Sequence, residues 1–397
     1  MKKRWDTLRQ SVIRATGPMT PLGRALLALG LAAWAIGARF GWRELSVIAG
    51  ACLLALLVAV LFTFGRTELQ VDVRLNPPRL IAGEKAVADV AVINAASRRM
   101  LPVRLEIPVG QSIAPINVPF LGAGDTFEET VLIPTLRRCV LAVGPVRSVR
   151  GDPLGLMRRE VQWSEAHELF VHPVTARLTG IAAGWLRDLE GRPTNDRSPS
   201  DVSFHTLREY VPGDDRRHVH WRTSARIGKL MVRQFIDNRR SHLGVVVDTN
   251  PASYADAEEF ELAVSMAASL GLRVIAEGQE LSCVAGNRGI NAHTGQALLD
   301  GLAGVELGVP AITIQETAMR AAPMVTAASV VALVSGSAMT LADLQLAAQR
   351  FGLDTQVLAL RATLGEEPGM TRAARLLSIT ADSLDSFTRV MWVVTNS

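Results

Sequence analysis

The chain has 397 residues, a length typical of about two or three domains. Its hydrophobic content of 48% exceeds that of a typical soluble protein, and its formal charge of +4 is too small to indicate nucleic-acid binding by itself. Three widely separated cysteines, Cys52, Cys139 and Cys283, give neither a disulfide framework nor the spacing of a metal site, and they fit a reducing compartment.

The N-terminal part of the chain combines basic residues with two apolar segments. Leu45 to Gly65 carries no charge and is long enough to cross a bilayer core of about 30 Å. Pro21 to Trp42 is less uniform, because Arg39 would have to reach the interface. We interpret residues 1–66 as a basic N-terminus and a transmembrane helical hairpin that turns at residues 41–44. By the positive-inside rule, this is a multi-pass protein of the cell membrane whose soluble domains are cytoplasmic.

Two alternatives to the hairpin remain open. If only the second apolar segment crosses the membrane, the remainder of the chain lies outside. A cleaved signal peptide is the other alternative, and the long charged stretch before the first apolar run argues against it.

Residues 67–175 have the patterning of a small β-sandwich-like domain. Apolar and polar residues alternate in the runs VDVRL, VADVAVI and VRLEI, and Gly- and Pro-containing turns separate them. No chemistry is indicated there. Residues 176–206 are rich in Gly, Pro and Ser, a composition that indicates a linker.

Residues 207–397 join a charged segment to an alternation of strands and helices that is typical of a parallel α/β sheet. The predicted strands lie at residues 243–247, 273–276, 281–285, 330–334 and 357–360, and the predicted helices at 256–270, 294–302 and 341–351. The last apolar run, Phe387 to Val394, predicts an edge strand.

The end of the first predicted strand of this sheet is a candidate site. Asp248 and Asn250 follow the strand at alternate positions, and their oxygens suit a hard divalent cation such as Mg²⁺. The other interpretation is a metal-free turn in which Asp248 caps the following helix, and it is favoured because Ser335, after a later strand, supplies no second carboxylate. No nucleophile elbow, phosphate loop or dinucleotide motif indicates an enzyme.

The charged segment, residues 207–235, mixes arginines, acids and aromatic residues more densely than any other part of the chain. We expect Asp214 or Asp215 to cap a short helical turn through residues 217–218. A strand is expected to follow from Lys229 to Ile236.

Several functions are open to this segment. His218 and His220 are two residues apart, as in a zinc pair, but their basic neighbours favour hydrogen bonds to carboxylates instead. The arginines could bind nucleic acid with help from aromatic stacking, dock a protein or anionic lipid, or form an internal network. Because Glu209, Asp214 and Asp215 can pair several arginines, the sequence favours the network, and no nucleic-acid partner is expected.

The same segment resembles the signature of a bacterial domain-of-unknown-function family, number 58 (DUF58), whose motif is R-E-Y-x-P-G-D-D-x-R-x-I-x-W-x-x-x-A-R-x-G-x-L. The motif is carried here by Arg208, Glu209, Tyr210, Pro212, Gly213, Asp214, Asp215, Arg217, Val219 in place of Ile, Trp221, Ala225, Arg226, Gly228 and Leu230. His220 and Lys229 lie within it and join these as candidate binding residues. The order of membrane hairpin, β-rich middle and α/β domain also agrees with that family over nearly the whole chain.

The resemblance implies a fold and partners. The α/β domain of that family is similar to the von Willebrand factor type A fold, whose cation site would fall here at Asp248, Asn250 and Ala252, with a later position near Ser335. Alanine and serine at the last two positions leave that site degraded. Members are often encoded beside MoxR-type AAA+ ATPases, and no catalytic activity is established for the family.

We therefore expect a membrane-anchored, non-enzymatic adaptor that docks a MoxR-type AAA+ ATPase or its clients and needs no cofactor. The alternatives are divalent-cation-dependent protein binding through Asp248 and nucleic-acid binding through the charged segment.

Overall fold

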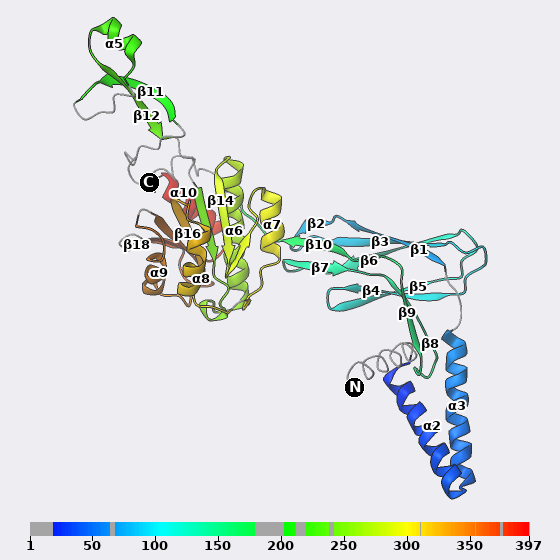
Figure 1. The fold of residues 1–397 in the computed structure, drawn as a ribbon. Coiled ribbons are helices and arrows are strands. Elements are labelled where there is room, and N and C mark those ends of the chain that lie inside the picture. The colour runs from blue at the N-terminus through cyan, green and yellow to red at the C-terminus, as the bar shows by residue number, and fades with distance from the viewer. Residues whose placement is uncertain are drawn as a thin grey trace, which may run out of the picture. The chain divides into compact units, whose positions relative to one another are not determined.

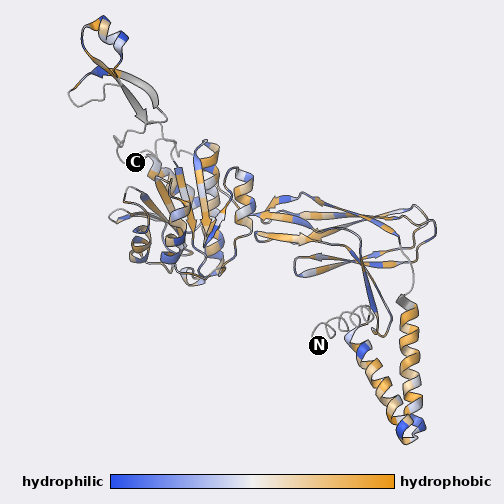
Figure 2. Cartoon of the chain, in the orientation of Figure 1, coloured by the Kyte–Doolittle hydropathy of each residue, from blue (hydrophilic) through white to orange (hydrophobic). Residues whose placement is uncertain are grey.

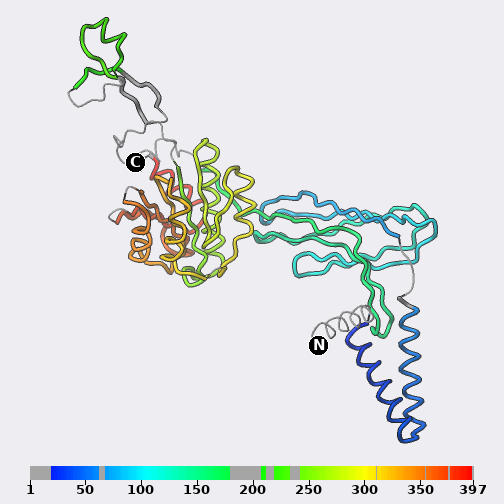
Figure 3. Tube along the Cα trace, in the orientation of Figure 1, coloured from blue at the N-terminus to red at the C-terminus, as the bar shows by residue number. Residues whose placement is uncertain are grey.

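The computed structural model of the chain describes residues 19–63, 68–178, 202–211, 219–237, 242–309, 311–353, 355–373 and 376–396. The chain divides into two compact units, Met1–His172 and Pro173–Ser397. The first unit contains two long helices and two β-sheets, and the second contains an α/β sheet and a two-stranded sheet (Figure 1). Figure 3 follows the path of the chain from blue at the N-terminus to red at the C-terminus.

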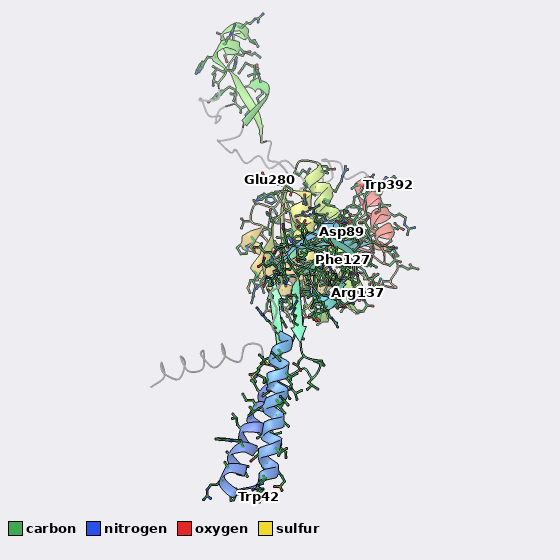
Figure 4. All side chains as sticks on the ribbon, turned by 90° about the vertical axis from the view of Figure 1, so that its right-hand side faces the viewer. Trp42, Asp89, Phe127, Arg137, Glu280 and Trp392 are labelled. Atoms are coloured by element: carbon green, nitrogen blue, oxygen red, sulfur yellow. The ribbon has the colours of Figure 1, made fainter. Side chains whose placement is uncertain are left out.

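Two apolar helices, α2 (Pro21–Phe40) and α3 (Arg43–Thr63), open the described chain. Both are long and apolar enough to cross a membrane. Figure 2 shows the apolar colour along both helices and hydrophilic residues at their connection, where Gly41 takes a left-handed φ of 71°. Trp42 lies at this tip (Figure 4). The predicted pair of helices is therefore present, with α3 beginning inside the predicted turn.

The two helices pack through small residues. Their buried positions are Gly23, Gly30, Ala33 and Gly37 in α2 and Ala49, Cys52, Leu56 and Ala59 in α3, of which Gly23, Leu56 and Ala59 also contact residues 156–157. The spacing of three, four or seven residues puts each set on one helix face. A Cβ added at Gly30 would lie 3.0 Å from the Cβ of Cys52. Glycine thus allows the close approach on which helix association in an apolar solvent depends.

The rest of the first unit consists of two sheets around one hydrophobic core. One sheet has the order β1-β3-β6 and the other β2-β10-β7-β4-β8-β9, with β5 paired to β4. The strands are β1 (Leu69–Asn76), β2 (Arg79–Ile81), β3 (Ala86–Asn94), β4 (Val103–Val109), β5 (Ser112–Val118), β6 (Thr126–Ile133), β7 (Cys139–Val143), β8 (Arg147–Gly151), β9 (Arg158–Gln162) and β10 (His167–His172). In β1 alternate residues are buried, so that Leu69, Val71 and Val73 join the core that both sheets share.

The second unit is built on a seven-stranded sheet with the order β15-β14-β13-β16-β17-β19-β18. Its strands are β13 (His242–Val247), β14 (Glu280–Ala285), β15 (Arg288–Ile290), β16 (Val330–Gly336), β17 (Gln356–Ala362), β18 (Gly369–Ala373) and β19 (Leu376–Ala381). The five inner strands are parallel, and β15 and β18 are antiparallel edges. The predicted α/β sheet is therefore present as a mixed sheet, parallel in its inner strands and antiparallel at its edges.

Helices cover both faces of this sheet. They are α6 (Ala257–Ala276), α7 (Gly295–Ala303), α8 (Ile314–Ala321), α9 (Leu341–Ala348) and α10 (Leu384–Asn396), with short 3₁₀ turns η2 (Pro251–Ser253) and η3 (Ala322–Met324). Side chains of α6, α7 and α10 pack in the core on one face, and those of α8 and α9 pack in the core on the other. The continuous Val, Leu and Ala runs of β13 and β16 follow from burial on both sides.

Two predicted strands of this unit are wrong. Residues 273–276 form the last turn of α6, where the guanidinium of Arg273 lies 2.6 Å from the carboxylate of Glu277, one turn later. Residues 387–394 belong to α10, because Phe387 and Met391 are both buried at helical spacing while Trp392 and Val393 are exposed. The β-branched residues within 387–394 indicated a strand. The burial of residues four positions apart shows that the segment packs as a helix instead.

Candidate functional site

The carboxyl ends of β13 and β16 mark the point where the strand order of the sheet reverses. From β13 the chain passes to β14 on one side and later to β16 on the other. Val247 pairs with Val334, so the next residues of the two strands, Asp248 and Ser335, are neighbours. Ligands of open α/β sheets bind at such a switch point. We call this place the switch-point edge, defined by Asp248, Ser253, Glu259, Ser335 and Ser337.

Asp248 is buried and fully engaged by its own loop. Its Oδ1 accepts a hydrogen bond from the backbone N–H of Asn250 at 2.9 Å, and its Oδ2 accepts one from the hydroxyl of Ser253 at 2.5 Å. The hydroxyl of Tyr254 donates to the Asp248 carbonyl at 2.6 Å. Burial raises the pKa of Asp248 to about 6, although the hydrogen bonds favour the ionised form.

Asn250 forms a turn. Its side-chain oxygen accepts from the N–H of Ala252 at 3.1 Å and caps η2. The cap of the following helix is Asp256, whose carboxylate accepts from the N–H of Glu259 at 2.9 Å. The prediction that Asp248 caps this helix is therefore wrong, because the eight residues 248–255, which include η2, separate the end of β13 from the cap.

In the described conformation, the side-chain oxygens at this edge do not form a site that fits a divalent cation. Asp248 uses both carboxylate oxygens internally, and Ala252 offers no side-chain oxygen. Ser335 pairs with Arg361 of the neighbouring strand β17. The guanidinium of Arg361 is permanently charged and donates a hydrogen bond to the Ser337 carbonyl at 3.0 Å. Within the described residues, no group of three or more His, Cys, Asp and Glu side chains could hold a metal. Cation binding at Asp248 and Asn250 stays a prediction.

Glu259 accepts more hydrogen bonds than Asp248, the other carboxylate of this edge, and no motif marks it in the sequence. Its carboxylate is buried and accepts from the N–H groups of Ala255 at 2.9 Å and Leu364 at 3.2 Å. It also accepts from the N–H of Ser337 at 3.2 Å and from its hydroxyl at 2.9 Å. The loops after β13, β16 and β17 are thus tied to one side chain. A sequence signal exists, since Glu259 lies on the same helical stripe as the buried Ala263.

Gly336 allows the strand end and the loop after β13 to approach each other. A Cβ at this position would lie 2.5 Å from the carbonyl oxygen of Ser253 and 2.8 Å from the Cα of Tyr254. Both are backbone atoms that cannot move away cheaply. Glycine beside Ser335 is therefore needed here for packing.

The signature segment forms a small element of its own, which we call the signature arm. It consists of β11 (Val202–Glu209), α5 (Trp221–Ile227) and β12 (Met231–Asp237). β11 and β12 pair antiparallel, with a bulge between Phe204 and Thr206. The strand predicted from Lys229 to Ile236 is thus confirmed, apart from a shift of its ends.

Helix α5 is held by His220 and Ser224. The Nδ1 of His220 accepts from the N–H of Thr223 at 3.2 Å, so this histidine is the N-cap. The Ser224 hydroxyl donates to the His220 carbonyl at 3.0 Å and accepts from the N–H of Met231 at 2.8 Å. These hydrogen bonds join α5 to β12. The Nδ1 of His220 is thus bonded to a backbone amide, and the nearby acids Asp214 and Asp215 lie outside the described residues.

The charged residues of the arm are brought together only in part. Lys229 pairs with Glu209, which raises the pKa of the lysine through the hydrogen bond and the charge. Arg208 donates to the Glu209 carbonyl at 3.1 Å, and the N–H of Tyr210 donates to the Leu230 carbonyl at 2.8 Å. The predicted site residues Pro212, Gly213, Asp214, Asp215 and Arg217, together with His218 and the expected cap and helical turn at 214–218, lie outside the described residues.

The outer side of α5 is apolar and basic. Trp221 is 65% exposed and Ile227 is 56% exposed. Arg222 and Arg226 of the same helix are also exposed. Trp and Arg are the residue types that most often dominate binding energy in protein interfaces.

Comparisons with known proteins agree with the position of this arm. Residues 206–363 match the family described as "Protein of unknown function DUF58". The chain is 25% identical over 238 residues to the uncharacterized protein YeaD of Bacillus subtilis (strain 168), an alignment that covers 56% of this chain and 57% of that protein. It thus spans little more than half the length of this relative.

Similarities to solved structures are weak. The CARDB domain of a Pyrococcus furiosus protein, in complex with di-metal ions, matches at a TM-score of 0.21 and 14% identity, covering 28% of this chain and 96% of that one. The alkylpurine DNA glycosylase AlkC of Pseudomonas fluorescens, bound to DNA with an abasic site analog, matches at 0.21 and 13% identity, covering 38% and 46%. At these scores neither similarity bears on function.

Proposed function

The chain belongs, through residues 206–363, to the DUF58 family of unknown function, and from that premise we propose that it is a membrane-anchored, non-enzymatic adaptor. Its signature arm would present a docking surface to a protein partner. The observation that carries the proposal is the outer side of α5, where Trp221 and Ile227 are exposed beside Arg222 and Arg226.

The arm supports docking because the larger apolar side chains that the structure describes in it are exposed. A two-stranded hairpin is only marginally stable in water unless another surface covers it. Val219 and Val232 are buried within it, whereas three larger apolar side chains, those of Trp221, Ile227 and Leu230, remain exposed. Covering them with a partner would stabilise both the arm and the complex.

The chemistry of the switch-point edge supports a non-enzymatic role. Asp248 and Glu259, the carboxylates placed where ligands of such sheets bind, are occupied by hydrogen bonds from their own loops. The strand order and the position of Asp248 suit the proposed von Willebrand factor type A-like fold. In this proposal that edge is a rigid support for the arm's domain.

The anchor is proposed to be the pair α2 and α3, which are long and apolar enough to span. By the positive-inside rule, the basic residues that precede them favour the cytoplasmic side for the β-sheets of the first unit and for the second unit. There they would meet the partner that the family resemblance implies, a MoxR-type AAA+ ATPase. An ATPase of that class, or a client presented to it, would contact the arm.

The test is binding of a purified MoxR-type ATPase to the full chain in lipid nanodiscs. Truncating a tryptophan at the centre of an interface typically costs about 2 kcal/mol or more, so Trp221→Ala should weaken binding by about thirtyfold. Arg226→Ala should weaken it less. Trp392→Ala on α10, where the tryptophan is 55% exposed, and Arg372→Ala on β18 are the matched controls and should bind like the wild type.

Two results would contradict the proposal. One is a wild-type chain that binds no ATPase. The other is an equal loss of affinity in Trp221→Ala and Trp392→Ala, which would locate the interface elsewhere or show that the effect is not specific to the arm.

A further inference from the structure

The two sheets of the first unit are joined to the apolar helices at two places. One is the chain itself, because β1 is the next element after α3. The other is the loop between β8 and β9 (Figure 1), where the N–H of Thr20, the N-cap of α2, donates to the Leu156 carbonyl at 3.1 Å. Leu156 packs so closely against Gly23 that a Cβ there would overlap its carbonyl oxygen, and it shares a buried cluster with Leu56 of α3. The sheets are therefore held close to one end of the helix pair.

This end of the helix pair lies at the membrane boundary if the helices span. A helix of 21 residues is about 31 Å long, close to the thickness of a bilayer core. The tip at Gly41 then lies at one interface, and the ends at Pro21 and Thr63 lie at the other. Glu68 is the fifth residue after Thr63, and five residues of chain reach at most about 18 Å. Residues bonded to Glu68 therefore lie close to the lipid headgroups.

Two loops of the sheets are held at this end. The N–H of Ala95, after β3, donates to the Glu68 carbonyl at 2.9 Å. The buried side chain of Asn94 donates to the carbonyls of Arg98 at 2.9 Å and Gly122 at 2.7 Å. One side chain thus ties the loop after β3 to the loop after β5, and both loops lie near the chain that leaves α3.

The two loops expose a pair of large apolar side chains. Met100 and Leu121 form an antiparallel bridge, in which the N–H of Met100 donates at 2.8 Å and the N–H of Leu121 donates at 3.2 Å. Both residues of the bridge are buried, whereas the adjacent Leu101 and Phe120 are 69% and 52% exposed. Leu101 and Phe120 are therefore cross-strand neighbours on the surface, and covering them would remove apolar area from water.

The register of the sheet places this pair on the side of the helices. β4 and β8 are antiparallel, with Arg104 opposite Val149. The start of β4 therefore lies toward the end of β8, from which the chain enters the loop that contacts α3. Leu101 precedes Arg104 by three residues, so it lies beyond the start of β4 on the same side.

Charged side chains border the apolar pair. Arg98 and Arg99 directly precede the bridge, and both are exposed. The acids Glu68 and Asp125 are exposed at the same end, and the carboxylate of Asp125 accepts from the N–H of Gly122 at 2.8 Å. The charge at this end is mixed. Binding must therefore come mainly from the apolar pair, while the arginines can add contacts to phosphate groups.

We propose that Leu101 and Phe120 insert into the surface of the phospholipid bilayer that holds α2 and α3, while Arg98 and Arg99 contact lipid phosphates. The proposal rests on the anchor part of the proposed function and goes beyond it, because it gives the sheets of the first unit their own contact with the membrane. Arginine forms charge-assisted, bidentate hydrogen bonds with phosphate groups. Phenylalanine and leucine beside basic residues are the pattern of an element that lies in the interface.

The first test measures depth in proteoliposomes of phosphatidylcholine and phosphatidylglycerol. Cys139→Ser serves as background, because Cys52 and Cys283 are buried. A fluorophore on Leu101→Cys should be quenched by brominated acyl chains and protected from aqueous iodide. The control is a fluorophore on Leu136→Cys, an 85% exposed position just beyond the opposite end of β6 from Phe120, which iodide should quench.

A further substitution tests whether the apolar pair causes the insertion. Phe120→Asp, combined with the fluorophore on Leu101→Cys, should increase quenching by iodide severalfold, because a carboxylate opposes entry into the acyl boundary. Equal quenching by iodide of the labels at positions 101 and 136 would overturn the proposal. Protection of the label at position 101 only after the ATPase is added would also overturn it, since the patch would then bind a protein.

The second test measures the contribution of the arginines. The full chain in a neutral detergent is titrated with phosphatidylglycerol and followed by native mass spectrometry. The double variant Arg98→Gln, Arg99→Gln should lower the affinity by about tenfold or more, because each basic residue near an anionic surface adds to binding. The control double variant Arg74→Gln, Arg372→Gln removes the same charge from β1 and β18 and should bind like the wild type.

Two results would overturn the contact between the arginines and lipid. One is an equal affinity of the two double variants for phosphatidylglycerol. The other is full competition by glycerol phosphate at the concentration of the lipid, since the arginines would then bind a soluble anion.

The outcomes separate this proposal from the adaptor function. Labelling of Trp42→Cys from the opposite side of the vesicle reports whether the helices span, independently of the two loops. A chain that spans but whose label at position 101 is quenched only from water would overturn the lipid contact and leave the anchor intact. The Arg98, Arg99 double variant should keep the affinity for the ATPase, whereas Trp221→Ala should keep the affinity for phosphatidylglycerol.

Discussion

The switch-point edge and the signature arm hold their polar groups in opposite ways. At the edge, Asp248 and Glu259 are buried and every hydrogen bond they accept comes from nearby loops of the same sheet. In the arm, Trp221, Arg222 and Arg226 are exposed on one short helix. The carboxylates of the edge hold its own loops in place, whereas the arm exposes tryptophan and arginine side chains, which are common in protein interfaces.

This difference shows that a place where ligands usually bind is not necessarily the functional site of the protein. A sheet edge where ligands usually bind can be structural when its carboxylates are satisfied by its own loops. A small hairpin can be the functional element when its exposed side chains suit an interface. The predictions below test the two regions in order of expected effect on stability.

The largest effect is expected at Glu259. Glu259→Ala leaves the N–H groups of Ala255, Ser337 and Leu364 without their acceptor in a buried place, and each unsatisfied donor costs about 1–3 kcal/mol. We expect a loss of about 3–5 kcal/mol in unfolding free energy. Thermal unfolding of the full chain in detergent measures it, with the exposed Glu367→Ala as control. Equal melting temperatures of the two variants would show that the loops do not depend on this carboxylate.

Asp248 should make the stability of the second unit depend on pH. Its folded pKa of about 6 lies above the ordinary 3.8, so the folded state holds the proton more tightly than the unfolded state. The stability that this group adds is complete below about pH 4 and is lost as the pH rises through about 6. The difference amounts to about 2–3 kcal/mol.

Asp248→Asn removes this titration while keeping the shape of the side chain. The variant should be more stable relative to the wild type at pH 7 than at pH 4, whereas the exposed Asp385→Asn should show no such change. The same pH profile in all three proteins would contradict the effect of burial. A rise in melting temperature with Mg²⁺ in the wild type but not in Asp248→Asn would favour the cation-binding alternative.

The smallest effect on stability is expected in the arm. Ser224→Ala removes the hydrogen bonds to His220 and Met231 that join α5 to β12. The Met231 amide should exchange with solvent about tenfold faster, while the α/β sheet should melt as before. Thr223→Ala, on the same helix, is the control. Two results would contradict a weakly stabilised docking element. One is an arm that unfolds at a higher temperature than the sheet, and the other is an unchanged exchange rate of the Met231 amide in Ser224→Ala.

Much of the fold could be read from local patterns. The uncharged run Leu45 to Gly65 and its shorter predecessor indicated two apolar helices because a span needs only length and hydropathy. The runs at 243–247 and 330–334 indicated buried parallel strands because both faces of such strands are covered. Helix α8 was not predicted, because its apolar stripe is short, although Thr313 and Glu316 form a capping box that marks its start.

The sequence by itself determined the apolar helix pair, the alternation of strands and helices, and the signature of the arm, since each rests on residues near one another in the chain. Only the tertiary structure determined which residues distant in the sequence pack together or share hydrogen bonds. Burial at helical spacing made residues 387–394 a helix, three distant loops gave Glu259 its hydrogen bonds, and the packing of Leu156 against Gly23 located the β8–β9 hairpin beside the apolar helices. These outcomes depend on contacts that no local spacing encodes, because burial and hydrogen-bond satisfaction are set by the neighbours that the fold supplies.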